Sequence, residues 1–83
     1  MLRVLYFASL REALGTADES LPVPDAATVA ALIEMLRNRG GAWAESLASG
    51  KRWRVAVNQN MVTLDAPLKA GDEVAIFPPV TGG

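Results

Sequence analysis

The sequence predicts a two-layer α+β domain, in which a mixed β-sheet packs against one main helix. The main helix is the clearest element. It begins at Thr28, and its apolar residues lie on one face at the spacing i, i+3, i+4 and i+7, namely Val29, Leu32, Ile33 and Leu36. Shorter segments with the composition of strands precede and follow this helix. With 83 residues, 51% of them hydrophobic, the chain has enough apolar surface for one small core.

The part before the main helix predicts a strand, a short helix and an edge strand. Residues 2–7 are apolar and partly aromatic, which suits a strand. Ser9 and Glu12 have the spacing of a capping box, and Gly15 supplies a stop, so a short helix is expected there. Residues 19–23 predict an edge strand, because the prolines within and after this segment cannot donate to an inner ladder.

The part after Thr28 predicts a second, shorter helix and three strands. Gly40 and Gly41 supply the backbone freedom of a C-cap, so the main helix is expected to end there. The remaining elements are expected at 42–48 (a short helix stopped by Gly50), 52–57 (a strand), 58–60 (a turn), 61–64 (a returning strand) and 73–77 (the last strand). The order β-α-β-α-α-β-β-β fits the ubiquitin-like β-grasp best among small folds.

Several classes of chemistry are absent from the composition. The chain has no histidine and no cysteine, so it lacks the commonest general base, thiolate metal ligands and a cysteine nucleophile. No Walker or G-x-G-x-x-G spacing occurs, and Asp72 and Glu73 are interpreted as polar turn residues. We therefore expect no bound cofactor, no metal and no catalysis by this chain alone.

The charge pattern also argues against nucleic acid and membranes as partners. The net charge is −1, and the only basic cluster, Lys51, Arg52 and Arg54, is interpreted as a solvated strand edge. No signal-peptide pattern begins the chain, and no apolar run approaches the ~20 residues that a membrane-spanning helix needs. The lack of cysteine favours a reducing compartment. A cytoplasmic location is expected.

The C-terminal segment is the most informative part of the sequence. We expect residues 1–77 to form the β-grasp domain and residues 78–83 a flexible tail, because prolines at 78 and 79 have no N–H with which to continue the last strand. Such a tail reaches at most about 20 Å when extended. A frayed terminus is the alternative interpretation of the final glycine pair. Glycines without Cβ atoms can, however, thread a narrow channel in another protein.

The end of this tail delivers the α-carboxylate of Gly83. A C-terminal carboxyl group has a pKa of ~3.3–3.7 and is ionised at pH 7, so it resists nucleophiles until it is activated. Formation of an acyl-adenylate with ATP is one such activation. Because this chain has no nucleotide-binding motif, a partner would have to bind the ATP. The sequence therefore predicts a substrate of that reaction rather than its catalyst.

Three stretches of the sequence show a family resemblance. They are Val4-Leu5-Tyr6-Phe7-Ala8-Ser9-Leu10-Arg11-Glu12 with Leu14-Gly15, then Ala56-Val57-Asn58-Gln59, and Pro67-Leu68 with the run from Gly71-Asp72-Glu73-Val74 to Phe77-Pro78-Pro79-Val80-Thr81-Gly82-Gly83. In these stretches the chain closely resembles the MoaD family, the small sulfur-carrying subunits of molybdopterin synthase. The resemblance extends over essentially the whole chain, and the F-P-P-V-T-G-G ending is its most specific part.

The resemblance implies a cycle of partners. A MoeB-like adenylating enzyme would convert Gly83 to an acyl-adenylate, and sulfur drawn from a cysteine desulfurase would displace AMP to leave a thiocarboxylate. The tail, residues Pro78, Pro79, Val80, Thr81, Gly82 and Gly83, would then enter a MoaE-like large subunit within a heterotetramer. There the sulfur would build the pterin dithiolene that holds molybdenum or tungsten, and the metal would never bind this chain.

A docking surface is predicted from strand phase. Phe7, Met61 and Phe77 are each out of phase with the core residues of their strands, so they are expected on the sheet face away from the helix. The resemblance implies that these positions meet the partner proteins and that Arg11 makes a charged contact on the same surface. Packing at a sheet edge, turn packing and simple solvation are the alternatives for these residues.

Three other functions remain open at this point. A protein modifier would use the same adenylation of Gly83 but form isopeptide bonds with lysines. A ThiS-type carrier would deliver sulfur for thiamin, although that family is typically shorter and lacks the F-P-P-V-T-G-G ending. A plain interaction domain would leave Gly82 and Gly83 without a role.

Overall fold

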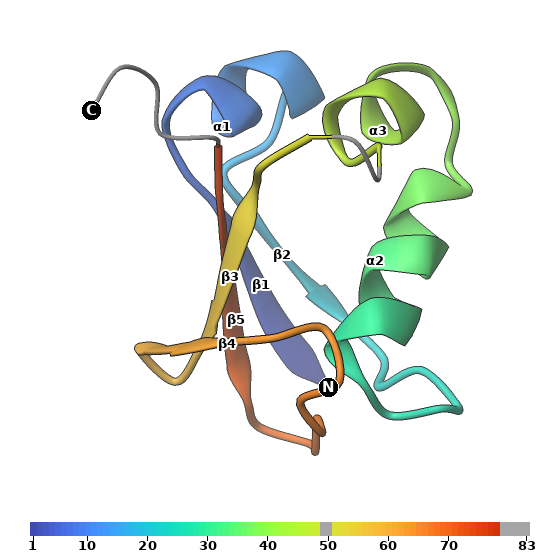
Figure 1. Ribbon diagram of the computed structural model, residues 1–83, viewed down its shortest axis with the longest axis vertical. Helices are drawn as coiled ribbons and strands as arrows, with labels where there is room; N and C mark the ends of the chain where they lie inside the picture. The colour runs from blue at the N-terminus through green and yellow to red at the C-terminus, as the bar shows by residue number, and fades with distance from the viewer. Residues whose placement is uncertain (49–50, 79–83) are drawn as a thin grey trace.

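The computed structural model describes residues 1–48 and 51–78, which form one five-stranded mixed sheet and three helices (Figure 1). The strand order across the sheet is β2-β1-β5-β3-β4. The elements are β1 Leu2–Tyr6, α1 Ala8–Leu14, β2 Asp18–Leu21, α2 Val29–Arg37, α3 Gly41–Ser46, β3 Arg54–Val57, β4 Asn60–Val62 and β5 Glu73–Phe77. The predicted order of elements and the β-grasp fold are confirmed.

The first and last strands form the centre of the sheet. β1 and β5 run parallel, with Val4 opposite Val74 and Tyr6 opposite Ile76. All four side chains are almost fully buried, and the apolar stripe of α2 packs with them in one core. The other strand pairs are antiparallel. β5 therefore has a hydrogen-bonded neighbour on each side, which anchors the chain at the point from which the C-terminal residues depart.

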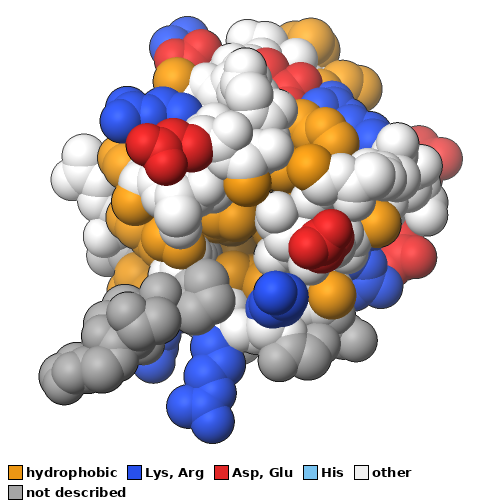
Figure 2. Space-filling model, turned by 90° about the horizontal axis from the view of Figure 1, so that it is seen from above, with side chains coloured by type: hydrophobic (Ala, Val, Ile, Leu, Met, Phe, Trp, Pro, Cys, Tyr) orange, Lys and Arg blue, Asp and Glu red, His pale blue; other side chains and the backbone are white. Residues whose placement is uncertain are grey.

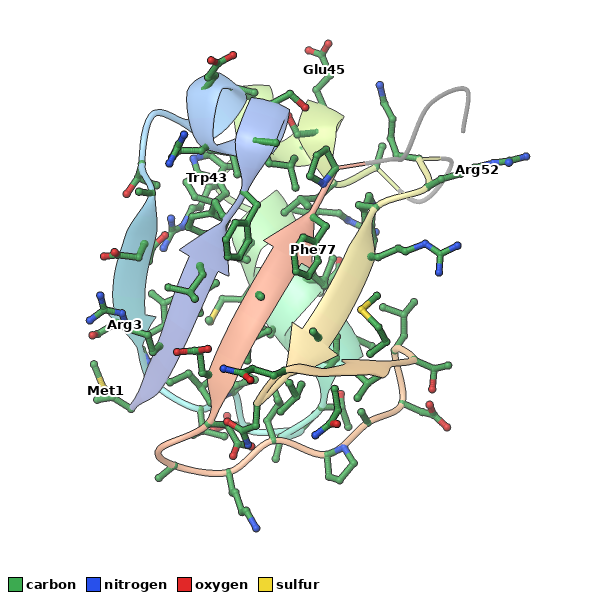
Figure 3. The ribbon with its side chains drawn as sticks, turned by 90° about the vertical axis from the view of Figure 1, so that its left-hand side faces the viewer. Met1, Arg3, Trp43, Glu45, Arg52 and Phe77 are labelled. Atoms are coloured by element: carbon green, nitrogen blue, oxygen red, sulfur yellow. The ribbon has the colours of Figure 1, made fainter. Side chains whose placement is uncertain are left out.

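The helices leave one face of the sheet uncovered. Figure 3 looks onto this face, and there the helices lie behind the sheet or beyond its upper end. α2 packs along the opposite face, where its buried residues are those predicted from the helical spacing: Val29, Leu32, Ile33 and Leu36. Thr28 caps this helix, because its hydroxyl accepts a hydrogen bond from the Ala31 N–H.

The predicted capping box at Ser9 and Glu12 is wrong. α1 begins at Ala8, its N-cap is the extended residue Phe7, and no side chain caps it. The cause lies in the sheet, because the Phe7 N–H donates to the Ile76 carbonyl at 3.2 Å and holds residue 7 in the strand conformation. Ser9 consequently falls inside the first turn. Gly15 is confirmed as the C-cap, with a φ of 74° that suits glycine.

The predicted end of the main helix at Gly40 and Gly41 is also wrong. α2 ends at Arg37 with Asn38 as its C-cap, and Gly40, at a φ of 77°, is instead the N-cap of α3. Tight turns replace the helix here, since the N–H groups of Arg39 and Gly40 bond to carbonyls only three residues back. The shorter helix is confirmed at 41–46 and stops before the predicted Gly50, which lies outside the described residues.

The hairpin that follows is confirmed, but its turn is shorter than the predicted 58–60, because Asn60 pairs with Val57 and already belongs to β4. Asn58 and Gln59 both have positive φ, as a two-residue hairpin turn requires. The returning strand ends at Val62 and does not include Leu64, which is 47% exposed. The chain leaves the sheet at this point because the Leu64 carbonyl accepts a hydrogen bond from the Ala30 N–H at the start of α2.

A partly buried polar cluster ties edge strand β2 to the rest of the domain. The carboxylate of Glu19 accepts hydrogen bonds from the Tyr6 hydroxyl at 2.7 Å and from both terminal nitrogens of Arg39 at 2.9 Å. Arg39 in turn lies over the ring of Trp43, which meets Tyr6 edge to face. The hydrogen bonds from Arg39 lower the pKa of Glu19, and burial raises the pKa of Tyr6, so the phenol stays neutral.

We expect Glu19→Gln to lower the free energy of unfolding by about 1–2 kcal/mol at pH 7, because it removes a charge from a paired, partly buried site. Since folding lowers the pKa of Glu19, its ionic contribution is complete above the unfolded-state pKa of ~4.3 and is lost as the pH falls through the folded-state pKa. The difference between wild type and variant in urea unfolding should therefore shrink in acid.

Glu34→Gln is the matched control. Glu34 pairs with Arg37 across one helical turn, but its side chain is 60% exposed, compared with 23% for Glu19. An exposed pair of this kind contributes little, so its loss should change stability by less than ~0.5 kcal/mol. Equal effects of the two substitutions would contradict a stabilising role for the Glu19 cluster.

Candidate docking surface and C-terminal tail

The uncovered face of the sheet carries six apolar residues, which we call the outer face: Leu5, Phe7, Ala56, Met61, Ala75 and Phe77. Its two alanines are buried, and Phe7 and Met61 are the most exposed of the six. The strand register explains its shape. Leu5 lies opposite Ala75, Ala75 opposite Ala56, and Ala56 opposite Met61, so one row crosses four strands. The small alanines in the middle of this row stand between the longer side chains of Leu5 and Met61. The outer face therefore has a shallow depression at its centre, between the longer side chains of Leu5 and Met61.

The two predicted phenylalanines are in contact at the tail end of this surface. The rings of Phe7 and Phe77 stack with centroids 4.9 Å apart and an interplanar angle of 11°. Phe77 lies near the middle of the sheet as Figure 3 shows it, and Phe7 is 39% exposed. The contact arises because β1 and β5 are parallel neighbours that end at the same edge of the sheet. Both residues are on the face that their strand phase predicted.

Met61 and Arg11 both lie at exposed positions, and β3 separates the strand of Met61 from that of Phe77. Met61 is 56% exposed and lies on edge strand β4, two strands away from Phe77 across β3. Arg11 is exposed on α1, whose buried residue is Leu10. The structure thus brings Phe7 and Phe77 together, and it places Met61 at the other side of the outer face. The role of these four residues in partner binding stays a prediction.

The predicted tail begins where β5 ends at Phe77. Pro78 follows the strand and is half-buried. Pro79, Val80, Thr81, Gly82 and Gly83 lie outside the described residues, so the boundary at residue 78 and the chemistry of Gly83 stay predictions. What the structure adds is the point of departure, since the tail leaves a central strand at the rim of the outer face.

Unlike Arg11, the basic residues Lys51, Arg52 and Arg54 were not recognised as part of a site from the sequence. Arg54 lies directly opposite Phe77 in the β3–β5 register. Among the described residues, no carboxylate forms an ion pair with Lys51, Arg52, Arg54 or Arg11. Figure 2 looks onto the end of the molecule that carries α1 and α3, where acidic, basic and apolar side chains are interspersed. The signal available in the sequence was the cluster at 51–54 itself.

The opposite end of the sheet is held by a structural carboxylate. Asp72 accepts hydrogen bonds from the Asn58 side chain at 3.0 Å and from the Lys69 N–H at 2.9 Å, and these bonds lower its pKa. The side-chain amide oxygen of Asn58 also accepts a hydrogen bond from the Glu73 N–H. Asp72 therefore joins two turns, which confirms its interpretation as a turn residue. Within residues 1–48 and 51–78, no group of histidine, cysteine or acidic side chains could hold a metal ion.

These features define a small ubiquitin-like β-grasp protein with an uncovered apolar sheet face. The chain belongs to the ThiS family, whose sequence model matches residues 4–83. Among the helices of the described residues, none has the length and apolar character to span a membrane.

Curated relatives match over the full length. The chain is 48% identical to the molybdopterin synthase sulfur carrier subunit of Escherichia coli and 47% identical to that of Haemophilus influenzae, with 100% of both chains covered in each comparison. The resemblance to small subunits of molybdopterin synthase is therefore confirmed. These relatives also separate the chain from a thiamin-type carrier, although the family model bears the ThiS name.

Solved structures share the fold. A putative molybdopterin converting factor subunit 1 from Pyrococcus furiosus has a TM-score of 0.78 at 34% identity, covering 95% of this chain and 97% of that chain. Small archaeal modifier protein 1 from Methanosarcina acetivorans has a TM-score of 0.73 at 29% identity, covering 99% and 95%. The complex of subunits 1 and 2 of molybdopterin-converting factor from Helicobacter pylori contains a chain with a TM-score of 0.68 at 24% identity, covering 99% and 97%, a likeness of fold alone.

We expect Met61→Ser to change the free energy of unfolding by less than ~0.5 kcal/mol, because an exposed side chain away from the core contributes little to folding. Leu32→Ala is the contrast, since Leu32 is fully buried beneath the sheet and its truncation should cost about 2–5 kcal/mol. Urea unfolding of both variants checks the difference. A large loss of stability in Met61→Ser would show that the outer face serves folding rather than docking.

Proposed function

We propose that this chain is the sulfur carrier subunit of a molybdopterin synthase. It presents the carboxylate of Gly83 to partner enzymes, receives sulfur there as a thiocarboxylate, and donates that sulfur to a pterin precursor in the large subunit. The chain is a non-catalytic small subunit, and the catalytic groups belong to the proteins that hold it. No cofactor of its own is required, since the ATP is bound and consumed by the adenylating partner.

The observation that carries this proposal is the course of β5. This strand is hydrogen-bonded on both sides at the centre of the sheet, and it ends at Phe77, beside the exposed ring of Phe7. A partner that docks on the outer face would consequently grip the domain next to the root of the tail. The family match, which extends to Gly83, supports a function for the terminal residue itself.

The chemistry proposed for Gly83 has two steps. A carboxylate oxygen attacks the α-phosphorus of ATP, which forms the acyl-adenylate and releases pyrophosphate. Sulfur at the oxidation level of hydrosulfide then attacks the acyl carbon and expels AMP, which leaves the thiocarboxylate. The first step is needed because a carboxylate has no good leaving group, and the absence of histidine and cysteine from the chain supports a partner as its catalyst.

Three partners follow from this cycle. The large, MoaE-like subunit is supported by the names of the full-length relatives, which are subunits of molybdopterin synthase. A MoeB-like adenylating enzyme is proposed from the chemistry of activation. A cysteine desulfurase is proposed as the source of sulfur, and a thiol reductant releases the sulfur from its persulfide as hydrosulfide. The proposed site of encounter is the cytoplasm.

A second candidate function is protein modification. The likeness to small archaeal modifier protein 1, at 29% identity, favours it, because an activated C-terminal carboxyl group can also be transferred to a lysine amine. The folded domain does not separate the two functions, since both need the same docking and the same activation. Their products differ, which allows a direct test.

We expect the protein, purified from cells that make the cofactor, to carry a mass increase equal to the exchange of one oxygen for one sulfur. The added mass should map to Gly83 by fragmentation. Deletion of Gly83 should abolish this increase and cofactor synthesis together, while the far-ultraviolet spectrum and unfolding midpoint stay unchanged, because the core lies entirely within residues 2–76.

Substitution of Thr16, a half-buried residue before β2 whose hydroxyl donates to the Asp18 carbonyl within its own turn, gives a control in the folded domain. Thr16→Ala should retain the mass increase. A ladder of conjugates on lysines without the thiocarboxylate would support the modifier instead. Cofactor synthesis by the Gly83 deletion would refute the sulfur-carrier function.

A further inference from the structure

A large groove lies at the β3–β4 edge of the sheet, outside the predicted partner residues except for Met61. It has a volume of about 770 Å³ and is open to solvent. Its apolar part is formed by Trp53, Met61 and Leu64, and its charged part by Lys51 and Arg54. Within residues 1–48 and 51–78, no acidic side chain lines it. An open, partly apolar groove with charge of one sign is complementary to a ligand that is both apolar and acidic.

The basic side chains of the groove are available for a partner. Lys51 and Arg54 are exposed, and no carboxylate of the described residues forms an ion pair with either of them. The chain as a whole has a net charge of −1, so this positive charge is local rather than a consequence of composition. Asp65, the acidic residue nearest along the chain to Leu64, does not line the groove and accepts a hydrogen bond from the Thr63 hydroxyl.

The base of the groove is held in place before any ligand arrives. The indole N–H of Trp53 donates to the Ala48 carbonyl at 3.1 Å, and the backbone N–H of Lys51 donates to the same carbonyl at 3.0 Å. Trp53 also packs against the hydrophobic core. A ring fixed in this way loses little conformational entropy on binding, which is a property of binding-site residues.

The groove is continuous with the outer face. Met61 belongs to both, and Arg54 lies opposite Phe77 in the sheet register. β4 has β3 as its partner strand and forms the edge of the sheet. A protein seated on the outer face can therefore extend around this edge into the groove without a gap.

We propose that the groove binds an acidic segment of the large subunit, one that places an apolar side chain against Trp53 and Leu64 and carboxylates beside Lys51 and Arg54. This inference rests on the proposed function, because it assigns a second contact to the same partner. A phosphate-bearing ligand fits less well, since the apolar wall would stay unfilled. The segment would add specificity and association rate through its charge, and affinity through the buried apolar contact.

The test is the affinity of the purified large subunit from the same organism for variants of this chain, measured by titration calorimetry at two salt concentrations. Arg54→Glu and Lys51→Glu should each weaken binding at least about tenfold at low salt, because they place like charges against the acidic segment. Leu64→Ser should weaken it several-fold at both salt concentrations. Each variant is first checked by thermal unfolding, which should be unchanged for these exposed residues.

Arg52→Glu is the matched control. Arg52 carries the same positive charge and lies between Lys51 and Arg54 in the sequence. Its side chain does not line the groove. Figure 3 shows it pointing outward from the molecule. Reversing the charge of Arg52 alters the net charge of the chain by the same amount. If the groove holds the segment, and not long-range electrostatic attraction, this variant should change the affinity less than about threefold.

Three outcomes would overturn the inference. Unchanged affinity of the large subunit for Arg54→Glu and Lys51→Glu would show that the groove does not bind the acidic segment. An equal loss of affinity in Arg52→Glu would show that the effect is long-range electrostatics. Loss of thiocarboxylate formation with full affinity for the large subunit would assign the groove to the adenylating enzyme. Thiocarboxylation of the wild-type protein is measured in parallel, so that its absence counts against the proposed function and not against the groove.

Discussion

The parallel pairing of β1 with β5 is the contact on which the rest of this structure depends. It joins the first and last strands of the folded domain, and its register places Val4, Tyr6, Val74 and Ile76 at the centre of the core. Such a pairing is slow to form because it closes a loop of nearly the whole chain. Once formed, it fixes where the C-terminal residues leave the domain. It also stacks Phe7 on Phe77 at that point.

The same strands serve folding on one face and leave the other available for contact. On the inner face, the branched and aromatic side chains of β1 and β5 meet α2. On the outer face, the short side chains of Ala56 and Ala75 leave a depression in the middle of the sheet, and the longer side chains of Leu5 and Met61 border it. An uncovered apolar sheet face costs little in a protein that is held by partners, because docking removes this surface from water. The proposed carrier function, with more than one partner, would use a surface of this kind.

Polar groups fix both ends of the domain without adding reactive chemistry. Glu19, shared between Tyr6 and Arg39, holds the edge strand β2 against the helices, whereas Asp72 joins the hairpin turn to the turn before β5. Each carboxylate is satisfied by hydrogen bonds that lower its pKa, so it stays ionised and unavailable as a proton donor near neutral pH. The folded domain therefore acts as a rigid support, and the proposed chemistry is left to the terminal carboxylate and to the partner enzymes.

The sequence by itself determined the order of the elements, the buried face of α2, the bounds of β5 and three residues of the outer face, namely Phe7, Met61 and Phe77. These features follow from local periodicity, from proline and glycine positions and from the alternation of strand residues. Only the tertiary structure decided where α1 starts and where β4 stops, because hydrogen bonds from distant segments override the local signals at Ser9 and Leu64. α2 ends before Gly40 because the N–H groups of Arg39 and Gly40 bond to carbonyls only three residues back. The groove beside Trp53 and Arg54 was likewise decided by tertiary structure, since strand pairing and the turn of the chain after β4 bring its two sides together.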